Sequence, residues 1–310
     1  MQDPIYNRIV NTKRPSVFAA SGLVLLAAIG LWASSLAASL LPEDSALTAA
    51  SLLYYLPFAA LPVALYLWRR PGCRESLRLN PPPELPLLGV ALLALLTAYA
   101  ASGLTALWDF ALDALGLHEP ATAGLPRTKQ ELSLSILLVA ALPAVCEELL
   151  FRGFVLSAWE GRGTAFAIGV TAGLFALLHA NLYGLPAYLM VGVISGCVTF
   201  ALDSVYAGMI YHTLYNAAVL ILSFLLSGQT GGEAAEAAAA SASVLLPVAL
   251  TTFTTLSLIA ALLATLLLRA RNAGIMAVPR VRRPLERRDK VMLAAALLAM
   301  AASTVIVLAV

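Results

Sequence analysis

The chain has 310 residues, of which 61% are hydrophobic and 12% are charged, and its mean hydropathy is +0.88. A soluble globular protein carries about 45–50% apolar and about 25% charged residues, so one buried core cannot account for this composition. Nineteen Lys and Arg against seventeen Asp and Glu give a net charge of only +2, which excludes the basic balance typical of nucleic-acid binding. The composition therefore indicates a protein embedded in a lipid bilayer, with no nucleic-acid partner.

Long apolar runs, separated by charge, proline and glycine, predict about nine membrane-spanning segments. About 18 or more apolar residues in succession suffice for a helix to cross about 30 Å of hydrocarbon, and runs without period-2 alternation favour helices over a barrel. The fold class is therefore predicted as all-α, a polytopic transmembrane bundle of eight to nine helices. The predicted spans are residues 16–41, 46–68, 86–108, 132–158, 164–181, 185–202, 205–227, 242–268 and 291–310.

The distribution of basic residues predicts the orientation of the bundle, because Lys and Arg that flank a span are retained on the cytoplasmic side. With the N-terminus inside, sixteen of the nineteen basic residues fall in cytoplasmic segments. Arg127 and Lys129 fall in outer loops, and Arg152 lies within a span. We therefore expect a multi-pass protein of the cell membrane with a cytoplasmic N-terminus.

Ionisable and polar side chains at membrane depth gather in three of the predicted spans. These are Glu147, Glu148 and Arg152 in 132–158, His179 in 164–181, and His212 and Asn216 in 205–227. A charge inside the bilayer costs at least about 2.5 kcal/mol and marks a functional site by default. At about 1.5 Å per helical residue, they fall in a common layer of the inner half of the membrane, which predicts a shared polar cavity. Along the chain we distinguish N-terminal helices (1–131), a core that holds these polar residues (132–227) and C-terminal helices with a basic cytoplasmic loop (228–310).

The spacing of these residues predicts how they pair. Glu148 and Arg152 are four residues apart, in the order that favours an ion pair on one helix face. Glu147 lies about 100° further round the helix and is left free to face a cavity. His212 and Asn216 are also four residues apart, so an imidazole and a carboxamide lie side by side, where they could hold a developing oxyanion.

Two further features predict packing around this site. Pro143 removes a backbone hydrogen bond four residues before Glu147, which predicts a kinked or loosened helix there. Two pairs of glycines at four-residue spacing predict that the spans 164–181 and 185–202 approach closely. These pairs are Gly169 with Gly173, and Gly192 with Gly196.

The chemistry available to this set is amide hydrolysis inside the membrane. A carboxylate with a nearby imidazole can take a proton from water, and a second imidazole with an amide can stabilise the tetrahedral anion that water forms with a carbonyl. Glu147, His179 and His212 could instead hold a divalent metal such as zinc, because a catalytic zinc site uses His and Glu and keeps a water position open. Cys146 lies among apolar residues, which keep a thiol inert. A proton-coupled transporter could use Glu and His as a relay, but no inverted repeat supports it.

Three short motifs carry a resemblance to a known family. They are Glu147-Glu148-x-x-x-Arg152, Phe175-x-x-x-His179 and His212-x-x-x-Asn216, in this order between about Leu132 and Ser227. This series resembles the CAAX protease and bacteriocin-processing (CPBP) family of intramembrane endopeptidases, the Ras-converting-enzyme type. The resemblance implies about eight transmembrane helices around a cavity open to the cytosol. The compact sequence, rich in Ala and Leu, is more similar to bacterial members, which implies a plasma-membrane enzyme whose substrates are not prenylated.

The resemblance also implies roles for the polar residues. It implies that Glu147 is the base that activates water and that His179 aids it. His212 and Asn216 would then form the oxyanion hole. Glu148 and Arg152 would be a supporting pair. It implies a peptide or membrane-protein substrate and no cofactor, with a divalent metal such as zinc as the alternative. A hypothesis of a different class is a non-proteolytic family member that binds a partner as an immunity or regulatory protein.

Overall fold

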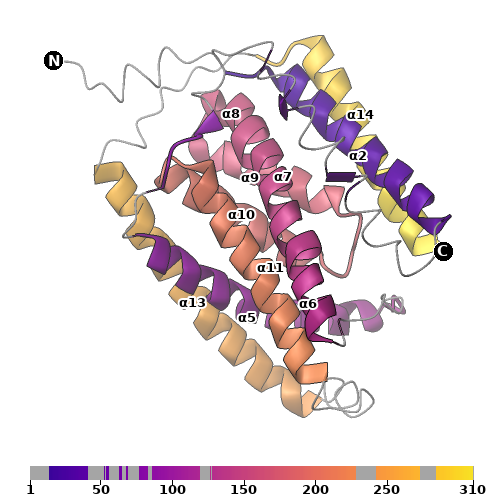
Figure 1. Ribbon diagram of the computed structural model, residues 1–310, viewed down its shortest axis with the longest axis vertical. Coiled ribbons are helices and arrows are strands. Elements are labelled where there is room, and N and C mark those ends of the chain that lie inside the picture. The colour runs from indigo at the N-terminus through magenta and orange to yellow at the C-terminus, as the bar shows by residue number, and fades with distance from the viewer. Residues whose placement is uncertain are drawn as a thin grey trace.

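In the computed structural model the chain is a bundle of helices, and the described residues contain no strand (Figure 1). The predicted all-α fold class is therefore confirmed. The structure describes residues 14–40, 77–82, 86–118, 128–227, 242–272 and 284–309, together with residues 52, 54, 55, 63, 64, 68 and 126. The predicted span 46–68 is mostly outside the described residues, as are the loop 228–241 and the middle of the basic segment 269–290.

The described helices follow the predicted spans. They are α2 (Val17–Ser39), α5 (Pro86–Asp113), a composite helix (Lys129–Arg162), α9 (Thr164–Leu178), α10 (Leu185–Ala201), α11 (Val205–Ser227), α13 (Ala242–Asn272) and α14 (Arg287–Ala309). By length and apolar composition, five of them could cross a membrane: α2, α5, the composite helix, α11 and α13. Helices α9 and α10 are apolar but shorter, with 15 and 17 residues. The polytopic architecture expected from the sequence is confirmed.

The composite helix changes its winding on both sides of the predicted site. It runs through α6 (Lys129–Ser135), η4 (Ile136–Ala141), α7 (Leu142–Glu148), η5 (Leu149–Val155), α8 (Leu156–Trp159) and η6 (Glu160–Arg162), in which η4 and η5 are π-helical and η6 is a 3₁₀ turn. Pro143 lies in the first turn of α7, where a missing N–H is tolerated because the helix is already interrupted. The predicted loosening near Pro143 is therefore present as the π-helical stretch η4, of a kind that frequently occurs at functional sites.

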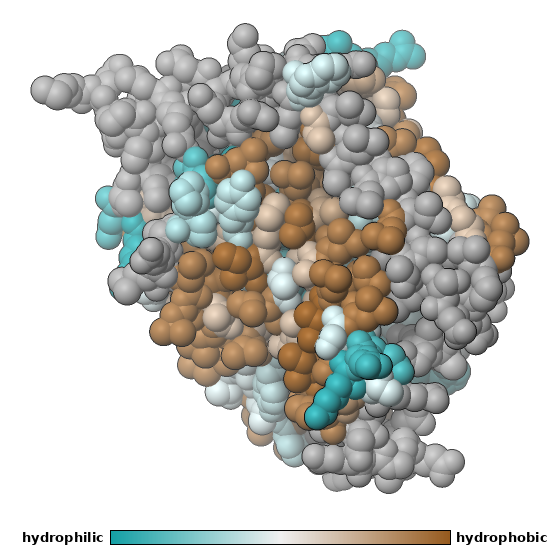
Figure 2. All heavy atoms as spheres, viewed as in Figure 1, coloured by the Kyte–Doolittle hydropathy of each residue, from teal (hydrophilic) through white to brown (hydrophobic). Residues whose placement is uncertain are grey.

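Helices from the two ends of the chain flank the central ones (Figure 1). Helix α2 packs along α14, and α5 packs along α13, while α10 packs between α9 and α11 and all three contact the composite helix. Large buried side chains such as Phe151, Phe154, Phe175 and Tyr211 fill the interior. Figure 2 shows apolar side chains over much of the described part of one face, as a surface in contact with lipid requires.

The close approach of α9 and α10 depends on the glycines of α10. A Cβ on Gly192 would lie 2.9 Å from the Cα of Ala172, and one on Gly196 would lie 3.1 Å from the Cγ2 of Ile168. A Cβ on Gly169 or Gly173 would have no neighbour within 4 Å. The predicted role is thus confirmed for the α10 pair and wrong for the α9 pair, because the α10-facing side of α9 carries Ile168 and Ala172 instead.

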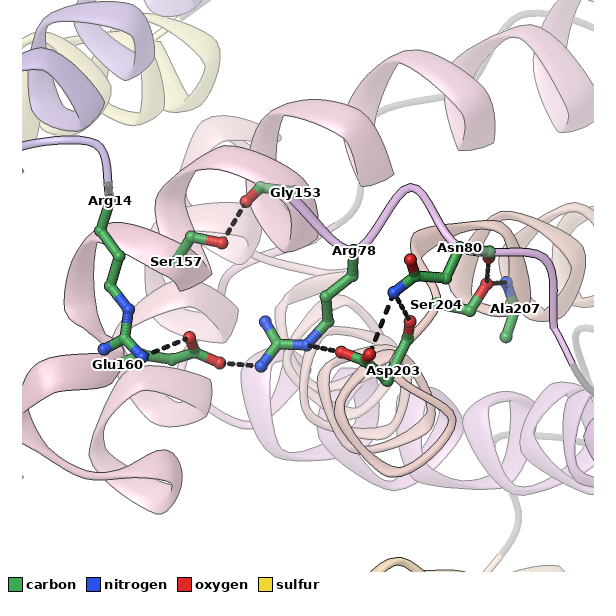
Figure 3. Close-up of polar contacts among 9 residues, drawn as sticks. All are labelled: Arg14, Arg78, Asn80, Gly153, Ser157, Glu160, Asp203, Ser204 and Ala207. Carbon is green, nitrogen blue, oxygen red and sulfur yellow. Dashed lines mark hydrogen bonds and ion pairs between the residues drawn. The ribbon is translucent and has the colours of Figure 1, made fainter. Parts of the chain in front are cut away.

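A cluster of ion pairs joins segments that the sequence assigns to the cytoplasmic side (Figure 3). Arg78 pairs with Glu160 at the end of the composite helix, and its Nε lies 3.2 Å from Oδ1 of Asp203, between α10 and α11. Arg14 adds a longer contact to Glu160, with 3.7 Å between Nη2 and Oε2. Arg78 and Asp203 both have positive φ, +53° and +46°, an uncommon conformation for residues other than glycine. The cluster holds the end of the composite helix against the start of α11.

Candidate active site

The polar residues predicted from the sequence surround one cavity of about 210 Å³. Its lining consists of Tyr55, Leu138, Val139, Pro143, Glu147, Phe175, His179, Tyr188, Val191, His212, Tyr215 and Asn216. Glu147 comes from α7, His179 from the C-terminal end of α9, and His212 and Asn216 from α11. The structure therefore brings together all four residues that the sequence nominates for catalysis.

Beneath the cavity, Glu148 is fully buried and engages three side chains. Its Oε1 lies 2.9 Å from Nη1 of Arg152 and 2.9 Å from Nδ1 of His212, and its Oε2 accepts a 2.6 Å hydrogen bond from the hydroxyl of Ser195. The ion pair predicted from the four-residue spacing is present. A buried carboxylate with this many charged and polar partners has its desolvation offset and a fixed orientation.

Arg152 is also fully buried, and its guanidinium connects the pair to the neighbouring helices. Its Nη2 donates to the carbonyl of Gly192 at 3.1 Å, and its Cζ lies 4.4 Å from the ring centre of Phe175. The Phe175 ring makes edge-on contacts with Phe151 and His212. Arg152 therefore supports the site from behind the cavity wall and does not line the cavity.

The hydrogen bond to Glu148 determines which nitrogen of His212 faces the cavity. An ionised carboxylate can only accept hydrogen bonds, so Nδ1 of His212 carries the proton that points to Glu148. The other nitrogen, Nε2, lies 4.0 Å from Oε2 of Glu147. His212 thus lies between two carboxylates, one that anchors it and one across the cavity.

Glu147 lines the cavity and makes different contacts from those of its sequence neighbour. The residue is 6% exposed, its Oε1 accepts a 3.1 Å hydrogen bond from the hydroxyl of Tyr55, and its Oε2 faces His212. Two consecutive helical residues point about 100° apart, which separates Glu147 from the buried network of Glu148. The adjacent carboxylates are therefore divided between the cavity and the helix interface.

His179 is held at the end of α9 by its own backbone. Its Nδ1 lies 2.8 Å from the carbonyl oxygen of Phe175, and a carbonyl only accepts, so Nδ1 is the protonated nitrogen. The imidazole stacks on the ring of Tyr188, with 4.0 Å between centroids and 21° between planes. Nε2 is therefore the nitrogen of His179 available to a bound molecule.

Asn216 uses a carbonyl that Pro143 leaves without its usual partner. In an α-helix the N–H of residue 143 would bond the carbonyl of Val139, but proline has no N–H to donate. The amide nitrogen of Asn216 lies 3.5 Å from this carbonyl oxygen. The loosened helix thus provides an acceptor in η4 for the Asn216 carboxamide at the edge of the cavity.

Sequence reasoning missed four residues that shape this site. Tyr55 contacts Glu147, Ser195 contacts Glu148, and Tyr188 stacks on His179. A Cβ on Gly208 would lie only 2.9 Å from Oε2 of Glu148, so the buried carboxylate requires a glycine there. None of these contacts follows from spacing within one helix, because each joins two different segments of the chain.

The residues named as alternative zinc ligands all line the cavity. Among the residues that the structure describes, no three His, Cys, Asp or Glu side chains form a group that could hold a metal ion. Glu147, His179 and His212 line the cavity, and both histidines direct Nδ1 away from it, to Phe175 and Glu148, so that Nε2 of each is the nitrogen left for the cavity.

Comparison with known proteins finds a family model that matches the central helices. Residues 129–218, less than a third of the chain, match the family model "Type II CAAX prenyl endopeptidase Rce1-like". No curated protein and no solved structure matches the chain significantly. The matched region contains all six polar residues on which the resemblance rests and most of the cavity lining. Through this core, the chain is similar to the Rce1-like type II CAAX prenyl endopeptidases, and its apolar helices are those of a multi-pass membrane protein.

Proposed function

We propose that the chain is an intramembrane endopeptidase in which Glu147 activates water for hydrolysis of a peptide bond. The observation that carries the proposal is the 4.0 Å gap between Oε2 of Glu147 and Nε2 of His212 at the cavity. The gap is too long for a direct hydrogen bond, and it leaves room for a water or substrate oxygen that contacts both atoms. Asn216 and His179 line the same space.

The reaction runs as a general-base hydrolysis. The water oxygen attacks the carbonyl carbon of the peptide bond while Glu147 takes a proton from the water, and the carbonyl electron pair moves onto its oxygen. Nε2 of His212 and the amide of Asn216 donate hydrogen bonds to this oxyanion, for which the His212 ring carries a proton on both nitrogens. Nε2 of His179 orients the water. The C–N bond then breaks, and Glu147 returns its proton to the leaving amine, so that a carboxylic acid and an amine leave.

The cavity lining supports a peptide or membrane-protein substrate with apolar side chains at the cleaved bond. Leu138, Val139, Pro143 and Val191 provide aliphatic walls around the polar centre. The clustering of Arg14 and Arg78 at one end of the bundle supports a cytoplasmic N-terminus by the positive-inside rule. The resemblance to bacterial members favours the plasma membrane as the location.

The experiment compares peptide termini in membranes from cells that produce the native protein, Glu147→Gln or Cys146→Ser at matched levels. Termini that appear with the native protein and Cys146→Ser but not with Glu147→Gln establish a glutamate-dependent protease and name its substrates. Cys146 is buried beside Glu147, so it controls for local disturbance and for thiol chemistry. Identical termini from the native protein and Glu147→Gln would overturn the proposal in favour of a non-proteolytic, partner-binding role.

A further inference from the structure

A tyrosine from outside the family core reaches the proposed catalytic carboxylate. Tyr55 precedes Glu147 by 92 residues and lies outside the matched region 129–218, yet its hydroxyl donates to Oε1 of Glu147 at 3.1 Å. Its ring is half-buried and lines the same cavity. The segment before α5 therefore contributes to a site whose other lining residues all lie within the matched region.

The two oxygens of Glu147 have different surroundings. Oε1 accepts from Tyr55, and Oε2 faces Nε2 of His212 across the gap in which we place the water. The last torsion of a glutamate side chain is soft and roughly two-fold, so packing alone does not fix which oxygen faces the gap. A hydrogen bond from a hydroxyl to one oxygen removes this freedom and sets the plane of the carboxylate.

We propose that Tyr55 is a positioning residue that holds Oε1 of Glu147 and so directs Oε2 toward the attacking water. The inference rests on the proposed role of Glu147 as base. Reacting groups must be placed within a fraction of an ångström for full efficiency. Loss of a hydrogen bond to a charged group typically corresponds to a 10- to 100-fold effect, and we expect a loss of turnover of about this size when the hydroxyl is removed.

Tyr54 provides a matched control at the adjacent position. Its side chain is 6% exposed, and its ring packs edge-on against that of Tyr55 with 4.8 Å between centroids. No hydrogen bond joins Tyr54 to Glu147 in the described structure. Tyr54→Phe and Tyr55→Phe remove the same atom from neighbouring rings, so a general effect on packing appears in both variants and a positioning effect appears only in the second.

The first test needs no substrate. Purified native protein, Tyr54→Phe and Tyr55→Phe are treated with diisopropylcarbodiimide, an apolar reagent that labels carboxyl groups, and the rate of labelling at Glu147 is followed by peptide mass spectrometry. We expect the reagent to label Glu147 several-fold faster in Tyr55→Phe than in the native protein or Tyr54→Phe, because the freed carboxylate samples more orientations in the cavity. Fragment spectra separate Glu147 from the buried Glu148. Equal rates in all three proteins would overturn the inference.

The second test measures cleavage of a peptide that spans a site found in the comparison of termini. We expect Tyr55→Phe to lower kcat about 10- to 100-fold with KM within about twofold, because the phenyl ring still lines the cavity, and Tyr54→Phe to match the native enzyme. A Tyr55→Phe variant with native kcat, together with an inactive Glu147→Gln, would refute the role of Tyr55 alone. Activity retained by Glu147→Gln would refute the proposed function, and carbodiimide labelling would still report the contact.

Discussion

Gly208 on α11 packs against the buried carboxylate of Glu148, and we expect Gly208→Ala to disrupt this contact. An added Cβ would lie 2.4 Å from Oγ1 of Thr199, 2.9 Å from Oε2 of Glu148 and 3.2 Å from Oγ of Ser195. Non-bonded heavy atoms prefer separations of about 3.5 Å or more. All three neighbours must therefore move, or α11 must shift away from α10.

The size of the loss in unfolding free energy depends on which neighbouring side chain can move. Thr199 can change its rotamer, since its hydroxyl has no hydrogen-bond partner in the described structure. Glu148 cannot follow without lengthening its contacts to Arg152, His212 and Ser195. Overpacking a buried site costs about 1–3 kcal/mol, and a weakened hydrogen bond to a buried charge costs a similar amount. We expect the free energy of unfolding to fall by about 2–3 kcal/mol.

The assay is thermal unfolding of the purified protein in detergent, with Gly173→Ala as the matched control. Both glycines lie inside helices, where Ala is favoured over Gly by about 0.5–1 kcal/mol, but a Cβ on Gly173 would have no neighbour within 4 Å. A loss of about 2–3 kcal/mol corresponds to a fall in Tm of roughly 4–10 °C. We expect this fall for Gly208→Ala and an unchanged or slightly higher Tm for Gly173→Ala. Equal Tm values for the two variants would refute the assigned contact.

Two further predictions concern the ion pairs of Arg78 and the amide of Asn216. Arg78→Ala leaves the carboxylates of Glu160 and Asp203 without their common partner, so we expect a loss of about 3 kcal/mol in unfolding free energy, measured by the same thermal assay. Arg288→Ala is the control, because Arg288 forms an exposed ion pair with Glu286 that contributes about 0–1 kcal/mol. Equal effects of Arg78→Ala and Arg288→Ala would contradict the prediction. Asn216→Ala should lower turnover of the identified peptide about 10²- to 10³-fold, as loss of an oxyanion donor does. A reduction smaller than tenfold would remove Asn216 from the oxyanion hole.

Hydropathy predicted the helices of this chain because lipid imposes one dominant rule, that each crossing segment is apolar and internally hydrogen-bonded. The bounds of the predicted spans and of the observed helices differ mainly at the membrane surface, where charge is tolerated. The predicted span 132–158 becomes a composite helix, Lys129–Arg162, and the predicted span 242–268 extends to Asn272 in α13. The additional residues are largely polar or charged, and they lie at helix ends where side chains reach water.

The site could be predicted in part because its polar residues stand out against an apolar background and recur at four-residue spacing. That reasoning identified Glu147 and His212 as cavity residues and Glu148 with Arg152 as a pair. It could not identify Ser195, since a serine among small residues of a helix is ordinary in a membrane protein. Nor could it identify the ion pair of Asp203 with Arg78, which joins the turn between α10 and α11 to the segment before α5. Such contacts depend on how helices pack, and no period in the sequence encodes them.

The buried pair of Glu148 and Arg152 is better explained by the placement of His212 than by stability. Both side chains are fully buried, and a buried ion pair is often no more stabilising than apolar residues of the same volume, because desolvation offsets the attraction. An apolar pair would leave Nδ1 of His212 without an acceptor and its ring free to turn. With Glu148 fixed by Arg152 and Ser195, only Nε2 of His212 can face Glu147. The first carboxylate of the motif thus performs the proposed chemistry, and the second determines the geometry in which it occurs.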